Sequence, residues 1–156
     1  MAQLEAPILG YDELARMPRA TREALFATGL IGPGNTARSL VCEACMEGHA
    51  EEVESVTRPN GVTQHFIYCP ENGRIEVNPD RLLQWVPCYD TVARHIAESL
   101  GTTGDCRPIM PGRLWDLGRV VAGGHSYHVW VARRLTADLR PHLPGDGASV
   151  LFVLGA

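Results

Sequence analysis

Three cysteines are the residues of this sequence whose types and spacing are best suited to chemistry. Cys42 and Cys45 are two residues apart, so one tight turn can direct both thiolates at the same ion. Cys69 begins a second short segment, Cys-Pro-Glu-Asn-Gly, directly after the apolar run Phe66-Ile67-Tyr68. Thiolates bind zinc in tetrahedral geometry, at about 2.3 Å each. The spacing therefore predicts a metal site at these three cysteines.

Residues 41–77 resemble a zinc ribbon, a module in which two Cys-x-x-Cys knuckles face each other across a β-hairpin. Cys42 and Cys45 correspond to the first knuckle and Cys69 to the start of the second, in which Asn72 stands in the position of the last cysteine. The resemblance implies a structural zinc ion in a rigid contact surface. Such surfaces recur in proteins of transcription, translation and mobile elements, which is an argument from fold analogy.

The fourth ligand is the open question at this site, because Asn72 is a poor zinc ligand. Another residue completes the site, or the site keeps an open position, or the ribbon persists without metal. His49 is the first choice, since Gly48 lets the chain bend there, and His65 is the second. An open position would suit a catalytic zinc with a nearby general base, for which the candidates are Glu43, Glu47 and Glu71.

Two other interpretations of the cysteines are weaker. If the three thiols bound no metal, the hairpin would have few apolar residues and no cross-link to stabilise it. This favours a bound metal. A redox role for the Cys42 and Cys45 pair would need an activating helix N-terminus, which the sequence does not predict there. Cys88 and Cys106 are expected to be half-buried small residues rather than nucleophiles.

The basic residues are unusual: all 14 are Arg and the chain has no lysine. This excludes a Walker A loop, a Schiff-base enzyme, a protein kinase, and Lys-containing nuclease or serine-lysine sites. Arg-only, Ala- and Gly-rich usage resembles that of a GC-rich bacterial gene. Residues 1–80 carry 6 Arg and 12 acidic residues, whereas residues 81–156 carry 8 and 6. Nucleic acid, if bound at all, is therefore expected at the C-terminal half.

Composition favours an ordinary globular protein, with 156 residues, 45% hydrophobic and 21% charged. One main core with a small satellite module is expected at this length. No run approaches the roughly 20 apolar residues of a bilayer-spanning helix, and the N-terminus lacks a signal-peptide pattern. Five cysteines in such a chain indicate a reducing compartment and metal binding rather than disulfides. We expect a cytoplasmic protein.

The pattern along the chain predicts an α+β fold in which a small zinc-ribbon-like β-hairpin module is joined to a mixed α/β core with a second β-hairpin. The expected parts are an N-terminal helical segment at residues 1–36, the zinc-ribbon-like module at 37–78, and the α/β core at 79–156, with its hairpin at 113–133. In the module, Asn60-Gly61 predicts a hairpin between strands at 52–57 and 63–68.

Five helices are expected around these hairpins. Asp12 can cap a short first one, and Pro18 can start a second that ends at Gly29. Asn78 can cap a third, with Leu82, Leu83 and Trp85 on its apolar face. The clearest is residues 90–100, with Asp90 at its start and Gly101 at its end. Thr136 can cap a further short helix, which Pro141 disrupts.

The second hairpin is a candidate binding surface. Alternation places Arg113, Trp115 and Arg119 on one face of its first strand. It likewise places His128, Trp130 and Arg134 on one face of the second strand. Arg beside aromatic rings can stack on bases and contact phosphates. The competing interpretation, which we favour, buries both tryptophans in the core. A hydrolytic or metal site at Asp116, His125 and His128 matches no known spacing.

The last strand, residues 150–154, is apolar on both faces, so it is either a covered central strand or an interface. We therefore expect a protein partner or self-association. The function favoured by the sequence is a noncatalytic binding or adaptor domain with a structural zinc site, serving a nucleic-acid or protein assembly. The alternative is a metal-dependent hydrolase, using an open zinc position or the His and Arg groups of the second hairpin.

Overall fold

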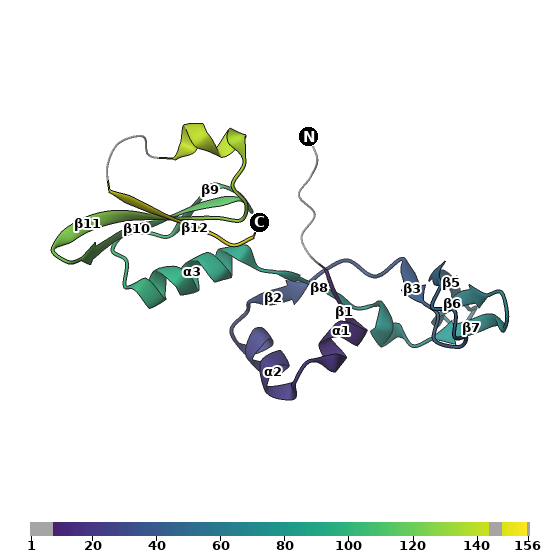
Figure 1. Cartoon of the computed structure of the whole chain (residues 1–156). Helices are drawn as coiled ribbons and strands as arrows, with labels where there is room; N and C mark the ends of the chain where they lie inside the picture. Colours follow the sequence, from purple (N-terminus) through teal and green to yellow (C-terminus); the bar gives the residue numbers. More distant parts are fainter. Residues whose placement is uncertain (1–7, 144–147, 156) are drawn as a thin grey trace. The chain divides into compact units, whose positions relative to one another are not determined.

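Short helices and several small, mostly antiparallel sheets make up the fold, which is α+β as predicted (Figure 1). The structure is a computed structural model that describes residues 8–143 and 148–155. The chain divides into two compact units, Met1–Pro87 and Cys88–Ala156. Residues 79–87, which the sequence assigned to the start of the α/β core, belong to the first unit. Within the described residues, no helix has the length and apolar character needed to cross a membrane.

The first unit begins with two short helices beside a three-stranded sheet of order β1-β8-β2. Its elements are β1 (Leu9–Gly10), α1 (Tyr11–Arg16), α2 (Arg19–Ala27), β2 (Ile31–Pro33) and β8 (Gln84–Pro87). Pro18 precedes α2 as predicted. Asp12 is not the cap of α1: Gly10 holds that position, and its N–H donates to Glu13 Oε2 at 2.8 Å.

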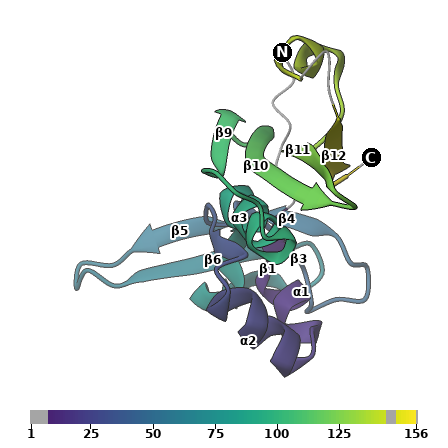
Figure 2. The same ribbon diagram turned by 90° about the vertical axis from the view of Figure 1, so that its left-hand side faces the viewer.

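Two small antiparallel sheets form the part of the first unit that contains the three predicted cysteines. They are β3 (Ser39–Val41) with β4 (Ala50–Glu52), and β5 (Glu54–Thr57), β6 (Thr63–Cys69) and β7 (Gly73–Val77). The predicted Asn-Gly turn joins β5 to β6, which pair from Glu54 opposite Phe66 to Thr57 opposite Thr63. Figure 2 shows this hairpin as a long two-stranded ribbon.

The helix expected after Asn78 is much shorter than predicted. Asn78 does cap it, accepting a hydrogen bond from the Asp80 N–H at 3.0 Å, but the element is a single 3₁₀ turn, η1 (Pro79–Leu82). Trp85 lies instead in β8, between β1 and β2. The sequence Leu-Leu-Gln-Trp-Val is compatible with a buried strand as well as with one face of a helix. The strand forms because β8 pairs with β1 on one edge and with β2 on the other.

The second unit is a four-stranded sheet with a helix on one face. Its elements are α3 (Tyr89–Leu100), β9 (Arg107–Met110), β10 (Leu114–Ala122), β11 (His125–Ala132), η2 (Ala137–His142) and β12 (Ser149–Val153). α3 lies along one face of this sheet (Figure 1), and its Ala93 and Ala97 belong to the same buried cluster as Trp115 and Val131. Leu139 of η2 packs in a separate cluster, which also contains Leu114, Trp130 and Ala132. The predicted second hairpin and the 90–100 helix are confirmed.

A β-bulge interrupts β10 between Asp116 and Gly118. Gly118 has a φ of +88° and lies against the Thr103 carbonyl, so a side chain there would be both strained and obstructed. Because the extra residue reverses the alternation, Arg119 pairs with His128 on the face opposite Trp115. The single face that the sequence predicted for Trp115 and Arg119 is therefore wrong.

The C-terminal strand is an edge strand rather than a covered central one. β12 pairs in parallel with β11 and ends the sheet order β12-β11-β10-β9. Val150, Phe152 and Val153 are exposed. Among the described residues no strand pairs with the outer side of β12, so the expectation of a central strand is wrong, and association with a partner stays a prediction.

Candidate metal centre

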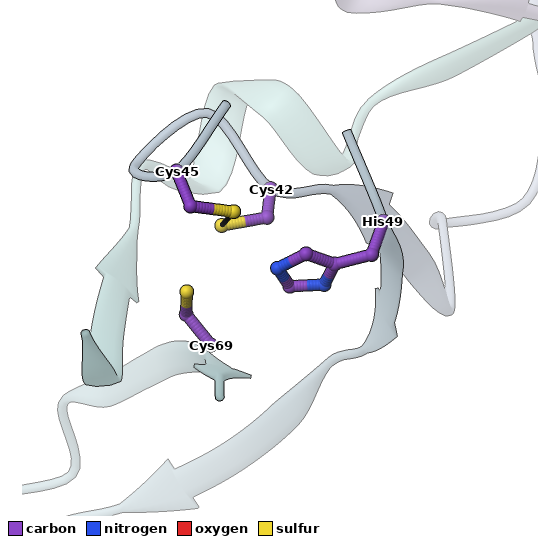
Figure 3. Close-up of side chains that lie close together, drawn as sticks. All are labelled: Cys42, Cys45, His49 and Cys69. Carbon is purple, nitrogen blue, oxygen red and sulfur yellow. Dashed lines mark hydrogen bonds between the residues drawn. The ribbon is translucent and has the colours of Figure 1, made fainter. Parts of the chain in front are cut away.

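Four side chains of the first unit converge on one point: Cys42, Cys45, His49 and Cys69 (Figure 3). Their potential ligand atoms all lie within 4.8 Å of one another, and the two sulfurs of the first knuckle are 3.8 Å apart. Cys42 and Cys69 are buried, and the other two side chains are half-buried. These residues are positioned to hold a metal ion, and they include all three predicted cysteines and the first-choice histidine.

Pairing between β3 and β4 brings His49 to the first knuckle. Val41 lies opposite Ala50, and just beyond this pair the Cys42 N–H donates to the His49 carbonyl at 2.8 Å. The loop between them can close because Gly48 adopts a φ of +64°, a conformation that other residues rarely take. This reversal of the chain places the imidazole beside the two thiols that precede it.

Glu51 fixes the orientation of the His49 ring. Nδ1 of His49 lies 2.8 Å from Oε1 of Glu51, so the carboxylate accepts the Nδ1 proton and leaves Nε2 with its lone pair. Nε2 is buried and has no hydrogen-bond partner among the described residues. A buried nitrogen without a partner is costly in an apo site but is satisfied by a metal ion.

Asn72 supports the second knuckle as a hydrogen-bond donor. Its Nδ2 donates to the Ala44 carbonyl at 2.9 Å and lies 3.5 Å from Cys69 Sγ. It thereby joins the two knuckles and stabilises negative charge on the sulfur. His49 lies with the three sulfurs, so the described residues offer four potential ligands without Asn72.

Arg81 ties the first knuckle to the N-terminal helices. Its Nη2 lies 3.2 Å from Asp12 Oδ2, 3.2 Å from Glu43 Oε1 and 3.3 Å from the Val41 carbonyl. The Arg81 side chain is 16% exposed, whereas those of Asp12 and Glu43 are 41% and 62% exposed, so water reaches both ion pairs. Arg81 therefore holds the backbone just before Cys42 in place.

The thiols and the imidazole of this cluster shift one another's pKa values. Burial raises the pKa of Cys69, but backbone N–H groups of Asn72 and Glu71 and the imidazole of His49 outweigh it and bring that pKa down to about 6. The same sulfur raises the pKa of His49. At Cys45 the backbone N–H of Glu47 lowers the pKa, yet burial and the neighbouring thiols raise it overall. A bound dication would hold the sulfurs as thiolates, because coordination displaces the thiol protons.

The second-choice histidine lies outside the centre. His65 is on β6 opposite Ser55, and its Nδ1 is 2.8 Å from Ser55 Oγ. Ile67 lies two positions after His65 on this strand, and Cys69 lies four positions after it. The three residues share a face, but His65 stays with its cross-strand partner.

Three of the candidate residues of the second hairpin lie together: Arg119 pairs with His128, whose ring centroid is 4.8 Å from that of Trp130. Trp115 and Trp130 are 1% and 7% exposed, so neither ring offers an open stacking surface. Arg113 donates to both carboxylate oxygens of Asp138, at 2.7 and 3.1 Å. Arg119 and Arg134 are exposed on different segments. These positions do not form one aromatic and basic platform.

Asp116 and His128 of the second hairpin are also in contact. Asp116 is buried, and its Oδ1 accepts from the Gly118 N–H at 2.9 Å and lies 2.7 Å from His128 Nε2. Arg107 contacts its other oxygen at 3.2 Å. Although burial raises the pKa of Asp116, these donors lower it overall. The carboxylate closes the bulge, and His125 makes no contact with it.

Two supporting residues of the metal centre were not predicted. Glu51 could have been found, since it lies two positions after His49 and strand alternation puts both on one face. No local sequence pattern indicates the role of Arg81, because its partners are about 40 and 70 residues away in the sequence. Comparison of the chain with protein-family models, with curated proteins and with solved structures finds no match in any of the three.

Proposed function

We propose that this protein is a noncatalytic binding or adaptor module whose centre at Cys42, Cys45, His49 and Cys69 holds a structural zinc ion. The observation that carries the proposal is the closed donor set: three sulfurs and one imidazole within 4.8 Å of one another. Three cysteines and one histidine are a common set for structural zinc and leave no tetrahedral position for water.

The donor types support zinc over harder cations. Calcium and magnesium prefer oxygen ligands, whereas thiolate and imidazole suit zinc and related soft metals. The position of the two knuckles on either side of a hairpin also supports the zinc-ribbon resemblance of residues 41–77.

The alternative of a metal-dependent hydrolase is less well supported. With His49 as a fourth donor, four protein atoms can fill a tetrahedral site without a catalytic water. In the second unit, Asp116 orients His128 but belongs to the bulge. We therefore assign the centre a structural role.

A protein partner is favoured over nucleic acid as the target of the module. Acidic residues surround the first knuckle, which repels phosphate backbones; they are Glu43, Glu47, Glu51, Glu52 and Glu54. Burial of Trp115 and Trp130 removes the stacking surface that single strands would use.

Cobalt substitution tests the closed site. The cobalt protein should show the spectrum of a tetrahedral centre with sulfur ligands, unchanged by added cyanide or azide, because no position is open. A Cys69→Ala variant, which opens one position, is the matched control and should respond to both anions. A response of the parent equal to that of the variant, together with hydrolysis of an activated ester, would favour the hydrolase.

A further inference from the structure

The edge strand β12 has none of the features that usually protect a sheet edge. Residues 148–155 read Ala-Ser-Val-Leu-Phe-Val-Leu-Gly, with no charge and no proline. Val150, Phe152 and Val153 are 37%, 38% and 45% exposed. Charges, proline or bulges typically keep natural edge strands from pairing with strands of other chains. An unprotected edge of this kind is suited to pairing with another strand.

The backbone of β12 has a defined outward side. The Ala148 carbonyl accepts from the His128 N–H, and the Leu154 N–H donates to the Ala132 carbonyl, both at 3.0 Å. Because successive residues point their backbone groups in opposite directions, even-numbered residues face β11. The N–H and C=O groups of Ser149, Leu151 and Val153 therefore face outward.

The exposed side chains of β12 extend an existing core. Val150 lies beside Val129 and Phe152 beside Val131 in the parallel register. Val129 and Val131 are buried under α3. Val150 and Phe152 thus continue the apolar face of the sheet beyond the area that the described residues cover.

We propose that two copies of this chain associate by antiparallel pairing of their β12 strands about a two-fold axis at Leu151. The outward groups of Ser149 and Val153 are equally spaced on either side of Leu151, so the strand is its own hydrogen-bonding complement. Val150 then lies opposite Phe152 of the second copy, in the non-hydrogen-bonded position where side chains come closest. The uncharged segment brings no like charges together.

Sedimentation equilibrium of the full zinc-loaded chain tests the association, with Ser149→Pro as the first variant. Ser149 begins β12 and its N–H faces outward, so proline is compatible with the isolated unit but removes two hydrogen bonds from the symmetric pair. The parent should dimerise, and the variant should do so about tenfold or more weakly. A parent that stays monomeric overturns the proposal and leaves the edge to a different protein.

Charge variants test the register. Val150→Lys with Phe152→Lys puts lysine opposite lysine at both positions and should abolish the dimer. Val150→Glu with Phe152→Lys removes the same apolar groups but puts opposite charges together, so it should restore a dimer that weakens with salt. Circular dichroism confirms that both variants fold. Dimerisation of the double-lysine variant, or its absence in the glutamate and lysine variant, overturns the proposed pairing.

Discussion

His49 is the ligand whose position depends most on the surrounding chain. The cysteines of the first knuckle lie on one turn, but His49 reaches the centre only because the loop reverses at Gly48 and β4 pairs with β3. Glu51 then directs Nε2 at the sulfurs. The identity of the fourth ligand therefore rests on local backbone geometry.

Replacing His49 tests this assignment. His49→Ala should weaken zinc binding by at least about 100-fold, since loss of an outer partner alone typically costs 10- to 100-fold. His65→Ala is the control and should leave affinity unchanged, because His65 pairs with Ser55. Competition with a chromophoric chelator measures both. Equal losses in the two variants would contradict the assignment.

Asn72 provides a second test at the same scale. Asn72→Ala should reduce zinc affinity about tenfold, through loss of the donor to Cys69 and of the link to Ala44. Asn72→Cys should not tighten binding, because His49 already completes the four ligands. A marked gain in affinity for Asn72→Cys would show that His49 is not bound.

The sequence could identify the three cysteines but not the role of Asn72. Spacing alone reveals thiols that can share an ion, and it reveals that a fourth cysteine is missing. It does not show that the Asn72 amide reaches a carbonyl 28 residues away. The choice of His49 over His65 likewise depended on chain bending at Gly48, a weak signal in a sequence.

Within the elements, the bulge in β10 determines how the second sheet is built. Asp116 accepts a hydrogen bond from the Gly118 N–H and contacts His128. The carboxylate thus provides an acceptor for a backbone N–H at the bulge. A glycine inside a strand pattern is a known sign of a bulge. Simple alternation overlooked it and assigned Arg119 to the wrong face. The hairpins themselves were predictable, because their turn residues carry strong local signals.

Gly118→Ala tests the close approach at the bulge. It should destabilise the second unit by about 1–3 kcal/mol, since the new side chain meets the Thr103 carbonyl and φ is positive. Gly123→Ala is matched for positive φ but has open space around it, so it should cost less. Urea unfolding followed by the fluorescence of Trp115 and Trp130 compares the two. A larger loss for Gly123→Ala would contradict the argument.

Acid should weaken the contact between Arg113 and η2. Hydrogen bonds from Arg113 and Thr136 bring the pKa of Asp138 down to about 2. Since the unfolded value is about 3.9, this contribution to stability is present above pH 4 and is lost as the pH falls through about 2. Asp138→Asn should therefore lower the urea midpoint at pH 7 and change it little at pH 2. An equal effect at both values would show that the charge is irrelevant.

Over the whole molecule, the metal centre and the second unit have separate cores. Cys42 and Cys69 are themselves members of the apolar cluster that contains Ile67, Val77 and Leu82. The clusters of the second unit contain no metal ligand. The sequence predicted one main core, because chain length does not show where packing divides.

Metal removal should therefore affect one unit selectively. A strong chelator should expose the amides of residues 37–82 to hydrogen exchange, because a core this small depends on the ion. Amides of α3, β10 and β11 should keep their protection. Exchange followed by mass spectrometry locates the change. Loss of protection across both units, or in neither, would contradict a local structural role for the metal.

X-ray absorption at the zinc edge, on protein purified without added metal, tests the central claim most directly. The account predicts one zinc per chain with three sulfurs at about 2.3 Å and one nitrogen at about 2.0–2.1 Å, from Cys42, Cys45, Cys69 and His49. A chain that contains no zinc, or a zinc with a bound water in place of the nitrogen, would contradict it.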